Sequence, residues 1–317
     1  MTKKTLVCLS AVAALALLPA CDEFDAIPPM GMVRATDPEA DALMYKADRC
    51  MKLGDSINKY KEIVREHPLA PNAAEARFKL GQAYEQKKDY REAFKQYTKL
   101  IDRYPQSPLY AEALNRQLAL AFAAAEGRLQ TPVLFGAWHT DMESSVVVEW
   151  LNTIMEKAPY NDMAATAASI LGKYQLDQDR PEAAREAYRN LVEKYPDSKY
   201  APEAQLMVAQ LWAESHTRGD NNLTNLTNAR EAYEEFSLRF PGHKDAGKAL
   251  KEASNVKRLL VQQELEVGRY YLERSHEYTS AIFCFENVVR QKSVNPQAAE
   301  EAAALLARAR ELAAAKH

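Results

Sequence analysis

The sequence has little of what breaks helices or builds sheets. Only 10 of its 317 residues are glycine, and no sustained run of alternating β-branched residues occurs. Alanine, leucine, glutamate and lysine, which are compatible with helices, are common instead. These features favour an all-α chain over a sheet-based fold.

The motifs of common catalytic and metal sites are also missing. The sequence contains no H-E-x-x-H, C-x-x-C, P-loop or G-x-S-x-G pattern, and its 6 histidines are dispersed. The closest group of metal-ligand types is His139, Asp141 and Glu143, a spacing that is common by chance. We therefore expect no enzymatic activity, metal or cofactor. With a net charge of −3 and both signs interspersed, we also expect no nucleic-acid partner.

An apolar run lies at the N-terminus. Lys3 and Lys4 precede Leu6–Leu18, which is too short to span a bilayer as a helix but has the length of a signal-peptide hydrophobic region. The run ends in Leu18-Pro19-Ala20-Cys21, which resembles a bacterial lipobox. We expect residues 1–20 to be a lipoprotein signal peptide and Cys21 to carry the lipid. The alternative is that Cys21 merely follows an ordinary cleavage site.

Cysteine is scarce outside this segment. Of the 4 in the chain, Cys8 lies in the predicted signal peptide and Cys21 is the proposed anchor. Cys50 and Cys284 fall in helical patterns at opposite ends of the remaining sequence. We expect both to be small core residues that do not form a disulfide. Residues 21–37, which include prolines and a glycine, are expected to form a tether.

Proline returns at regular intervals in the rest of the sequence. The intervals between Pro68, Pro105, Pro159, Pro196 and Pro241 are 37, 54, 37 and 45 residues, which is a period of 37 with insertions of 17 and 8. A fixed period of this size indicates a chain of similar supersecondary units.

The second unit shows what is repeated. It resembles the tetratricopeptide pattern L-G-x-x-Y, A-x-x-x-F, P, with Leu80, Gly81, Tyr84, Ala93, Tyr97 and Pro105 at these positions. Gly81 and Ala93 are small, which allows the two helices of the unit to cross closely. The other units follow the same frame. We therefore predict a right-handed superhelical solenoid with units at about 38–68, 69–105, 106–159, 160–196, 197–241 and 242–296, and a capping helix over 297–316.

Three segments depart from the regular unit. Gly127–Glu143 contains Phe135 and Trp138, and it either covers the chain's own helices or contacts a partner. Thr217–Asn228 is polar and is predicted to be a solvated loop. Lys244–Arg274 contains no proline and is predicted to form one helix about 45 Å long.

A solenoid of this kind predicts a peptide-binding groove. Residues of each unit's first helix that point away from the core line its concave face, which suits an extended peptide or a helix. The candidate groove residues are Phe78, Gln82, Glu85, Ser169 and Lys173. For each of them the alternative is a solvated helix face.

The last unit supports a narrower resemblance. Its long helix ends in V-x-x-Y-Y-x-x-R over residues 267–274. Together with the signal and the number of units, this string resembles the BamD (YfiO, ComL) family of outer-membrane assembly lipoproteins. The resemblance implies a non-enzymatic subunit of the β-barrel assembly machinery on the periplasmic face of the outer membrane. Arg269, Tyr270 and Arg274 are then candidate partner contacts.

The same resemblance implies two protein partners. The N-terminal repeats would receive C-terminal segments of unfolded barrel proteins, and the C-terminal repeats would hold the barrel subunit through its periplasmic domains. A different periplasmic scaffold, coordinating cell-envelope or peptidoglycan synthesis, is the alternative. Asp22 directly follows the proposed anchor, a position that favours the inner membrane in enteric bacteria, so both membranes stay open.

Overall fold

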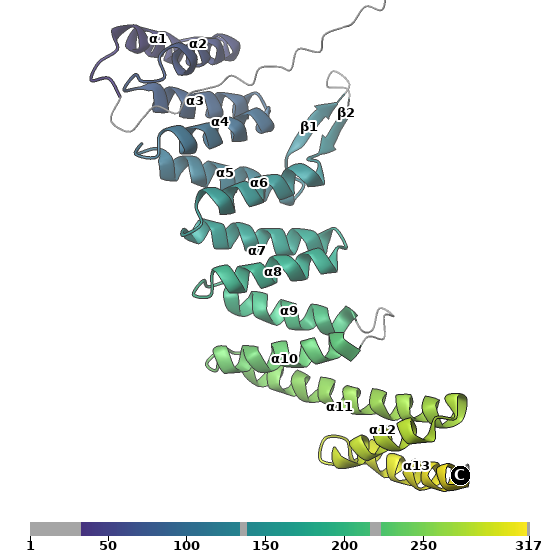
Figure 1. Ribbon diagram of the computed structural model, residues 1–317. Coiled ribbons are helices and arrows are strands. Elements are labelled where there is room, and N and C mark those ends of the chain that lie inside the picture. The colour runs from purple at the N-terminus through teal and green to yellow at the C-terminus, as the bar shows by residue number, and fades with distance from the viewer. Residues whose placement is uncertain (1–32, 134–137, 216–222, 316–317) are drawn as a thin grey trace, which may run out of the picture.

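The chain stacks helix upon helix into a column (Figure 1). The computed structural model describes residues 33–133, 138–215 and 223–315, and within these ranges it contains thirteen α-helices in consecutive packed pairs. The prediction of an all-α solenoid of helix pairs is confirmed. The predicted signal peptide, Cys21 and most of the predicted tether lie outside the described residues.

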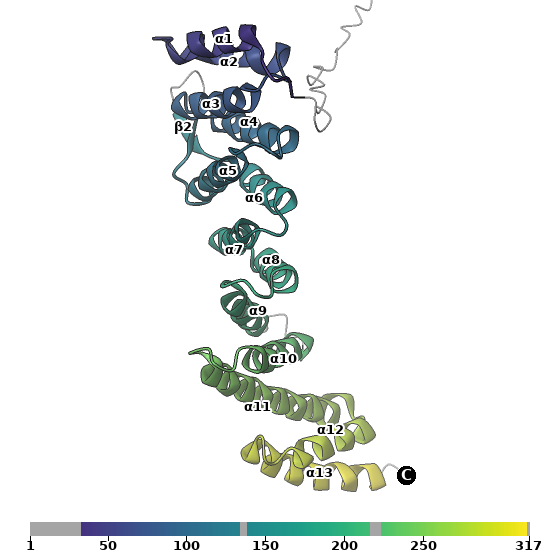
Figure 2. The ribbon, with the colours of Figure 1, turned by 90° about the vertical axis from the view of Figure 1, so that its left-hand side faces the viewer.

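Six pairs and a final helix make up the column. The pairs are α1 (Pro38–Asp48) with α2 (Leu53–Glu66), α3 (Ala73–Gln86) with α4 (Tyr90–Arg103), α5 (Tyr110–Ala125) with α6 (Ser144–Lys157), α7 (Asp162–Asp177) with α8 (Pro181–Lys194), α9 (Ala201–Ser215) with α10 (Leu223–Arg239), and α11 (Ala246–Tyr270) with α12 (Tyr278–Arg290). The final helix is α13 (Pro296–Ala315), which packs on α12. From α3 to α10 the first helices lie on one side and the second helices on the other (Figure 2). We call these sides the A-face and the B-face.

The recurring prolines mark where the second helices end. In each of the first five pairs the second helix stops two residues before a proline of the periodic series. A residue that precedes proline is disfavoured in the α conformation, so the helix cannot run on into the turn. At the other end, Asp89 accepts a hydrogen bond from the backbone N–H of Glu92 (3.4 Å) and caps α4.

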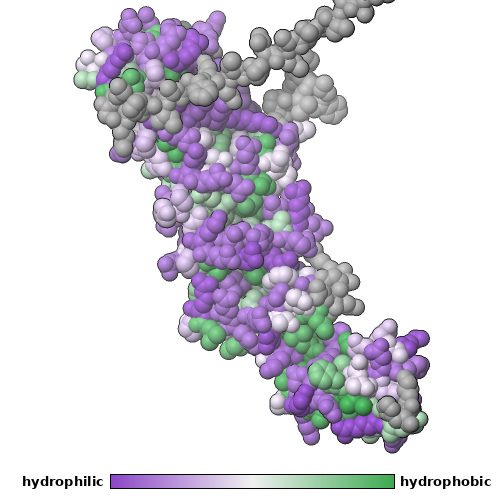
Figure 3. Space-filling view, in the orientation of Figure 1, coloured by the Kyte–Doolittle hydropathy of each residue, from purple (hydrophilic) through white to green (hydrophobic). Residues whose placement is uncertain are grey.

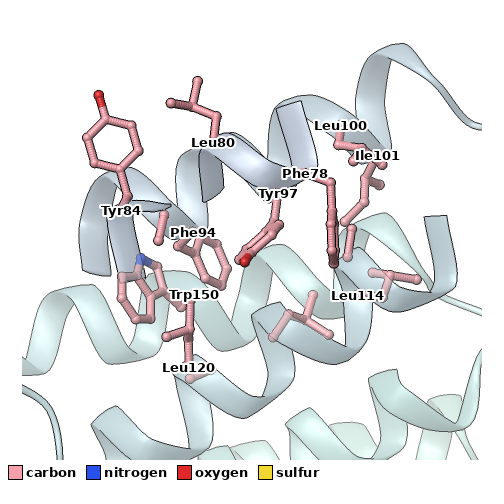
Figure 4. Packing of buried hydrophobic residues seen from close by; sticks show 14 of the residues in the cluster. Phe78, Leu80, Tyr84, Phe94, Tyr97, Leu100, Ile101, Leu114, Leu120 and Trp150 are labelled. Atoms are coloured by element: carbon pink, nitrogen blue, oxygen red, sulfur yellow. The ribbon is translucent and has the colours of Figure 1, made fainter. Parts of the chain in front are cut away.

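A glycine beneath an aromatic ring brings the helices of three pairs together. A Cβ on Gly81 would lie 2.6 Å from the ring of Tyr97, one on Gly172 2.5 Å from Tyr188, and one on Gly268 2.6 Å from Phe285. The close crossing expected at Gly81 is therefore confirmed. Between pairs, the rings of Phe94 on α4 and Trp150 on α6 stack at 4.5 Å (Figure 4).

The insertion between α5 and α6 forms a small hairpin. Strands β1 (Gln130–Val133) and β2 (Trp138–Asp141) pair antiparallel, with Gln130 opposite Asp141, and stand at the side of the column (Figure 1). These strands are not predictable from the sequence, because four residues are too few to show an alternating pattern. Phe135 and the side chain of Trp138 lie outside the described residues, so both interpretations of the insertion stay predictions.

The prediction of a polar loop over Thr217–Asn228 is wrong for the second half of this segment. Helix α10 already begins at Leu223, and Asn225 and Leu226 are buried. Leu226, Ala229 and Tyr233 share one helix face because they are spaced three and four residues apart. This face packs into the core. The burial of these side chains stabilises the helix although the segment as a whole is polar.

The predicted long helix of the last unit is confirmed, but it begins and ends at other residues than predicted. Helix α11 runs from Ala246 to Tyr270, about 38 Å at 1.5 Å per residue, and extends past α10 (Figure 1). It continues into η2 (Tyr271–Ser275), a π-helical turn that His276 closes in the left-handed conformation at φ 54°. A π-helical turn interrupts the regular ladder and is often found at functional sites.

Helix α11 also connects two separate hydrophobic cores. Its first half contributes Ala249 and Val256 to the core around α8–α10. Its second half contributes Val261 and Leu265 to the core formed with α12 and α13. The last unit therefore has its own core, joined to the column through one helix. Across the described ranges, none of the helices has both the length and the apolar character to cross a membrane.

The two cysteines of the described ranges lie at opposite ends of the column. Cys284 on α12 is buried, as expected of a core residue. Cys50 differs from the prediction: it follows α1 in a turn and is half-buried. Its thiol donates to the carbonyl oxygen of Lys46 (3.2 Å) and so satisfies a backbone acceptor in the last turn of α1.

Candidate functional site

A hollow of about 430 Å³ opens on the A-face near the N-terminal end of the column. We call it the A-face groove. It lies between α3 and the turn that leads into α5, and its lining includes Ala74, Phe78, Gln82, Ser107, Pro108 and Leu109. The lining is mainly apolar, with polar groups at the edge, as in sites that hold an apolar side chain of a peptide.

The turn on one side of the groove is fixed by Ser107. Its backbone N–H donates to the carbonyl of Tyr104 (2.9 Å), and its hydroxyl oxygen accepts from the N–H of Leu109 (3.2 Å). The phenol of Tyr104 in turn donates to the carbonyl of Pro68 (2.9 Å) in the preceding turn. Two successive inter-pair turns are thus tied together, so this wall of the groove is rigid before a ligand arrives.

An ion-pair network forms the opposite edge. Lys79 on α3 contacts Asp48 (2.8 Å) and Glu75 (2.9 Å), and the Tyr60 hydroxyl donates to Asp48 (2.6 Å). Burial favours the protonated form of Asp48, but the hydrogen bonds from Lys79 and Tyr60 outweigh it and lower the pKa of the carboxyl. The network connects α1, α2 and α3, and its one lysine and two carboxylates leave the groove edge with a net negative charge.

The predicted groove residues of the second unit have different roles. Phe78 and Gln82 line the A-face groove, although Phe78 is only 7% exposed and its ring packs 5.6 Å from that of Tyr97. Glu85 instead accepts a hydrogen bond from the Tyr97 hydroxyl (2.5 Å) and pairs with Arg116 (3.2 Å). It thereby joins α3, α4 and α5. Burial and this hydrogen bond raise the pKa of Tyr97.

The predicted groove residues of the fourth unit lie elsewhere. Ser169 is half-buried on α7, and Lys173 is exposed and pairs with Asp177 one turn away (2.7 Å). Neither of them lines the A-face groove. The structure therefore brings Phe78 and Gln82 together with residues of the next turn and separates Ser169 and Lys173 from them.

Of the three predicted partner contacts in the last unit, one stabilises the packing of its helices and two lie at the surface. Arg269 pairs with Glu266 (3.3 Å) and with Glu301 of α13, so it holds α13 against α11. Tyr270 is 59% exposed, and Arg274 is exposed on η2. Val267, Tyr270 and Arg274 follow one another at spacings of three and four residues, and we call them the α11–η2 surface. Apolar and polar residues are intermixed over this end of the molecule (Figure 3).

Sequence reasoning missed two groups of residues. One is the inter-pair turn with Pro108 and Leu109, which forms half of the A-face groove. The other is a basic hollow between α2 and α4 on the B-face, lined by Lys61, Arg65, Lys95 and Lys99. On each of two successive second helices, two basic residues are four positions apart and therefore share one helix face. This spacing could have predicted the hollow from the sequence. Across the described ranges, no cluster of three potential metal-binding side chains occurs.

Comparison with protein families gives two matches, both to the tetratricopeptide repeat. One covers residues 52–108, from α2 to the turn before α5, and the other covers residues 167–198 of α7 and α8. The chain contains tetratricopeptide repeats. Proteins with such repeats are typically non-catalytic scaffolds, and their repeats bind protein or peptide partners. All lining residues of the A-face groove except Leu109 lie inside the first match.

Solved structures resemble this chain only distantly. MamA from Desulfovibrio magneticus RS-1 is 16% identical, with 66% of this chain and 99% of that chain covered and a TM-score of 0.30. A tetratricopeptide repeat protein from Parabacteroides merdae ATCC 43184 is 13% identical, with 86% and 99% covered and a TM-score of 0.31. The Rap conjugation gene regulator of plasmid pLS20, in complex with the Phr* peptide, is 17% identical, with 86% and 82% covered and a TM-score of 0.25. These scores carry no argument about function. Curated proteins gave no match.

Proposed function

We propose that this chain is a lipid-anchored scaffold of the outer-membrane β-barrel assembly machinery, exposed on the periplasmic face of the membrane. The observation that carries the proposal is the α11–η2 surface. The string over residues 267–274 that resembles the BamD family coincides with the end of the longest helix and with a π-helical turn. Tyr270 and Arg274 of that string are exposed.

The two ends of the column suit different partners. The A-face groove has an apolar lining and a rigid wall, which suits the alternating apolar side chains of an extended C-terminal segment from an unfolded barrel protein. The α11–η2 surface combines an exposed tyrosine with an arginine, a composition typical of protein interfaces. It would hold the periplasmic domains of the barrel subunit.

The membrane part of the proposal concerns residues outside the described ranges. Cys21 would carry the lipid after removal of residues 1–20. Membrane fractionation and the mass of the mature N-terminus test it. An acylated Cys21 in the outer-membrane fraction is the expected result, and an unmodified Cys21 or a different first residue would contradict it.

Affinity capture from detergent-solubilised membranes tests the partner. We expect the wild-type chain to retain a protein with repeated periplasmic domains and a C-terminal barrel. The Tyr270→Ala/Arg274→Glu variant should retain at least about tenfold less of it. Lys173→Glu, an exposed charge change on α7, is the matched control and should capture as much as the wild type. Capture of a peptidoglycan synthase as the main partner would favour the alternative scaffold role.

Peptide binding tests the groove separately. A fluorescent peptide with the last ten residues of an outer-membrane barrel protein should bind the full chain with a Kd in the micromolar range, about 1–100 μM. Leu109→Asp places a charge in the apolar lining and should weaken binding about tenfold. Lys173→Glu again serves as the control. Equal affinity of the two variants would remove the A-face groove from the proposal.

A further inference from the structure

A hollow on the B-face, between the second helices α6 and α8, shares no lining residue with the A-face groove. It has a volume of about 410 Å³, which is within the range of sites that bind ligands. Helices α6 and α8 lie on the B-face, and α7 lies on the other side of the column (Figure 2). We call this hollow the α6–α8 pocket. Its lining comes from all three helices and from the turns that follow α6 and α8.

The floor of the pocket is apolar and is made of small side chains. Ala168 on α7 and Ala187 on α8 both line it, and both are buried. Ala187 has the repeat position that Trp150 has in α6, because each stands nine residues before the periodic proline. The ring of Trp150 stacks on Phe94 of the preceding second helix at 4.5 Å. Alanine at this position in α8 leaves room that a ligand can fill.

The pocket also lies where two hydrophobic cores meet. Leu171 and Ala187 belong to the core that begins at α1, whereas Ala168 belongs to the core around α8–α10. Met155, which lines the pocket from α6, packs against both cores. An apolar side chain placed in the pocket would therefore contact both cores and remove apolar surface from water.

Tyr195, which also lines the pocket, lacks the hydrogen bond that its counterpart in the second pair makes. Tyr104 and Tyr195 each directly precede a periodic proline. The Tyr104 hydroxyl donates to the carbonyl of Pro68, 36 positions earlier (2.9 Å). Pro159 lies the same number of positions before Tyr195 and lines the pocket. Within the part of the chain that the structure describes, the Tyr195 hydroxyl bonds neither to Pro159 nor to another residue, and burial alone raises its pKa.

The two walls of the pocket carry further polar groups that match a peptide. Asn152 on α6 has a side-chain amide with the same donor and acceptor groups as a peptide bond. Asn190 on α8 donates to Glu186 (3.1 Å), and its oxygen is a further acceptor. Glu156 on α6 and Lys194 on α8 are exposed and form no ion pair with any residue in the described ranges. The walls thus present opposite charges, which complement a segment that carries both signs.

We propose that the α6–α8 pocket binds an extended peptide segment of a partner protein, with one apolar side chain between an acidic and a basic residue. The apolar side chain lies on the floor formed by Ala168, Leu171 and Ala187, the acidic residue pairs with Lys194, and the basic residue pairs with Glu156. Residues two positions apart in an extended segment point to the same side, so all three side chains reach the pocket. This inference goes beyond the proposed function, because it needs neither the A-face groove nor the α11–η2 surface.

Methyl NMR of the full chain in detergent tests the binding, because the Met155 methyl group reports on the pocket. The probes are two peptides with blocked ends, Thr-Asp-Thr-Phe-Thr-Lys-Thr and Thr-Lys-Thr-Phe-Thr-Asp-Thr, in which threonine favours the extended form. We expect at least one of them to shift the Met155 signal with a Kd below about 1 mM. The signal of the exposed Met51 should not move. A Met155 signal that neither peptide shifts would overturn the proposal.

Exchanging the two wall charges tests how the peptide lies. The wild type should prefer one of the two peptides by at least about threefold. Glu156→Lys/Lys194→Glu has the same net charge and should prefer the other peptide by a similar factor. Lys173→Glu on α7 and Leu109→Asp in the A-face groove are controls that should keep the wild-type preference and affinity. An unchanged preference in the exchanged variant, or loss of binding in Leu109→Asp, would argue decisively against the α6–α8 pocket.

The two equivalent tyrosines provide a matched pair of variants. Tyr195→Phe should weaken peptide binding at least about threefold and leave the urea midpoint of unfolding unchanged, because the hydroxyl has no partner in the described fold. Tyr104→Phe should shift the midpoint to lower urea, because it removes the bond to Pro68, and leave the peptide affinity unchanged. If both substitutions change affinity and midpoint alike, the proposal is rejected.

Discussion

The ring of Tyr188 on α8 occupies the space where any side chain at Gly172 on α7 would stand. An added Cβ would lie 2.5 Å from Cε1 of the ring, closer than atoms of these types approach one another. The same relation joins Gly81 to Tyr97 and Gly268 to Phe285. The glycine of the repeat is therefore a steric requirement of the crossing, and it can be tested at one position.

Gly172→Ala should destabilise the protein by about 1–3 kcal/mol, because the new methyl group forces the helices apart or moves the ring. Urea unfolding of the full chain measures this. Gly247→Ala on α11 is the matched control, since no atom lies within 4 Å of its added Cβ. There the better helix propensity of alanine should leave stability unchanged or raise it by up to about 1 kcal/mol. Equal effects at the two positions would contradict the steric explanation.

The hydroxyl of Tyr97 should contribute more stability than that of Tyr188. Tyr97→Phe removes a hydrogen bond to the Glu85 carboxylate and should cost about 1–2 kcal/mol of unfolding free energy. Tyr188 has the same position in its pair, but Glu203 and Asp177 act on its pKa through charge alone, and burial with these charges raises that pKa to about 12. Tyr188→Phe should therefore cost less than about 0.5 kcal/mol. The two variants are compared by urea unfolding at neutral pH, and a larger loss for Tyr188→Phe would refute the prediction.

The stacked rings of Phe94 and Trp150 should carry most of the contact between α4 and α6. Trp150 is 4% exposed, and its replacement by alanine should cost about 3–5 kcal/mol. A double-mutant cycle of Phe94→Leu with Trp150→Leu isolates the ring pair, for which we expect a coupling energy of about 0.5–1.5 kcal/mol. A coupling near zero would show that burial alone, and not the stacked geometry, holds the two helices together.

The stability that Asp37 confers should depend on pH. Its carboxylate accepts from the N–H of Ala40 (3.1 Å) and contacts His67 (3.1 Å) and Arg34 (3.3 Å). The hydrogen bond from Ala40 and the neighbouring His67 and Arg34 outweigh burial and lower the pKa of Asp37 below its ordinary 3.8. A lowered folded-state pKa means that the stability is present above the unfolded-state pKa and is lost as pH falls through the folded-state value.

Asp37→Asn separates charge from capping, because asparagine also caps helices. At about pH 7 the wild type should unfold at a higher urea concentration than Asp37→Asn. The difference should shrink as the pH falls below 3.8. A difference of the same size at about pH 7 and about pH 3 would assign the effect of Asp37 to packing.

The repeat frame could be predicted from the sequence because it depends on neighbours along the chain. Proline stops a helix within two residues, and a glycine and a tyrosine sixteen positions apart meet because two short helices fold back on one another. The long α11 was predictable for the same reason, since no proline interrupts it. The start of α10 was not predictable from the sequence, because its polar first turn becomes helical only through the burial of Leu226.

The candidate site was predicted only in part. Phe78 and Gln82 were found from their helix positions, but the other wall of the A-face groove comes from the next turn, around Leu109. Glu85 looks like a groove residue by spacing, yet its carboxylate is held by Tyr97 and Arg116 from two other helices. Partners that lie far apart in the sequence decide which polar side chains remain available to a ligand.

The sequence by itself determined the helix pairs, their order and the close crossing at glycine in three of the pairs, because these follow from spacings of three, four and 37 residues along one chain. Only the tertiary structure decided the rest. The separate core of the last unit and the union of α2 and α4 into one basic groove arise from contacts between segments distant in the sequence. The hairpin of β1 and β2 is local, but its four-residue strands are too short to show an alternating pattern. Such contacts form where packed helices share a surface, and no local spacing encodes them.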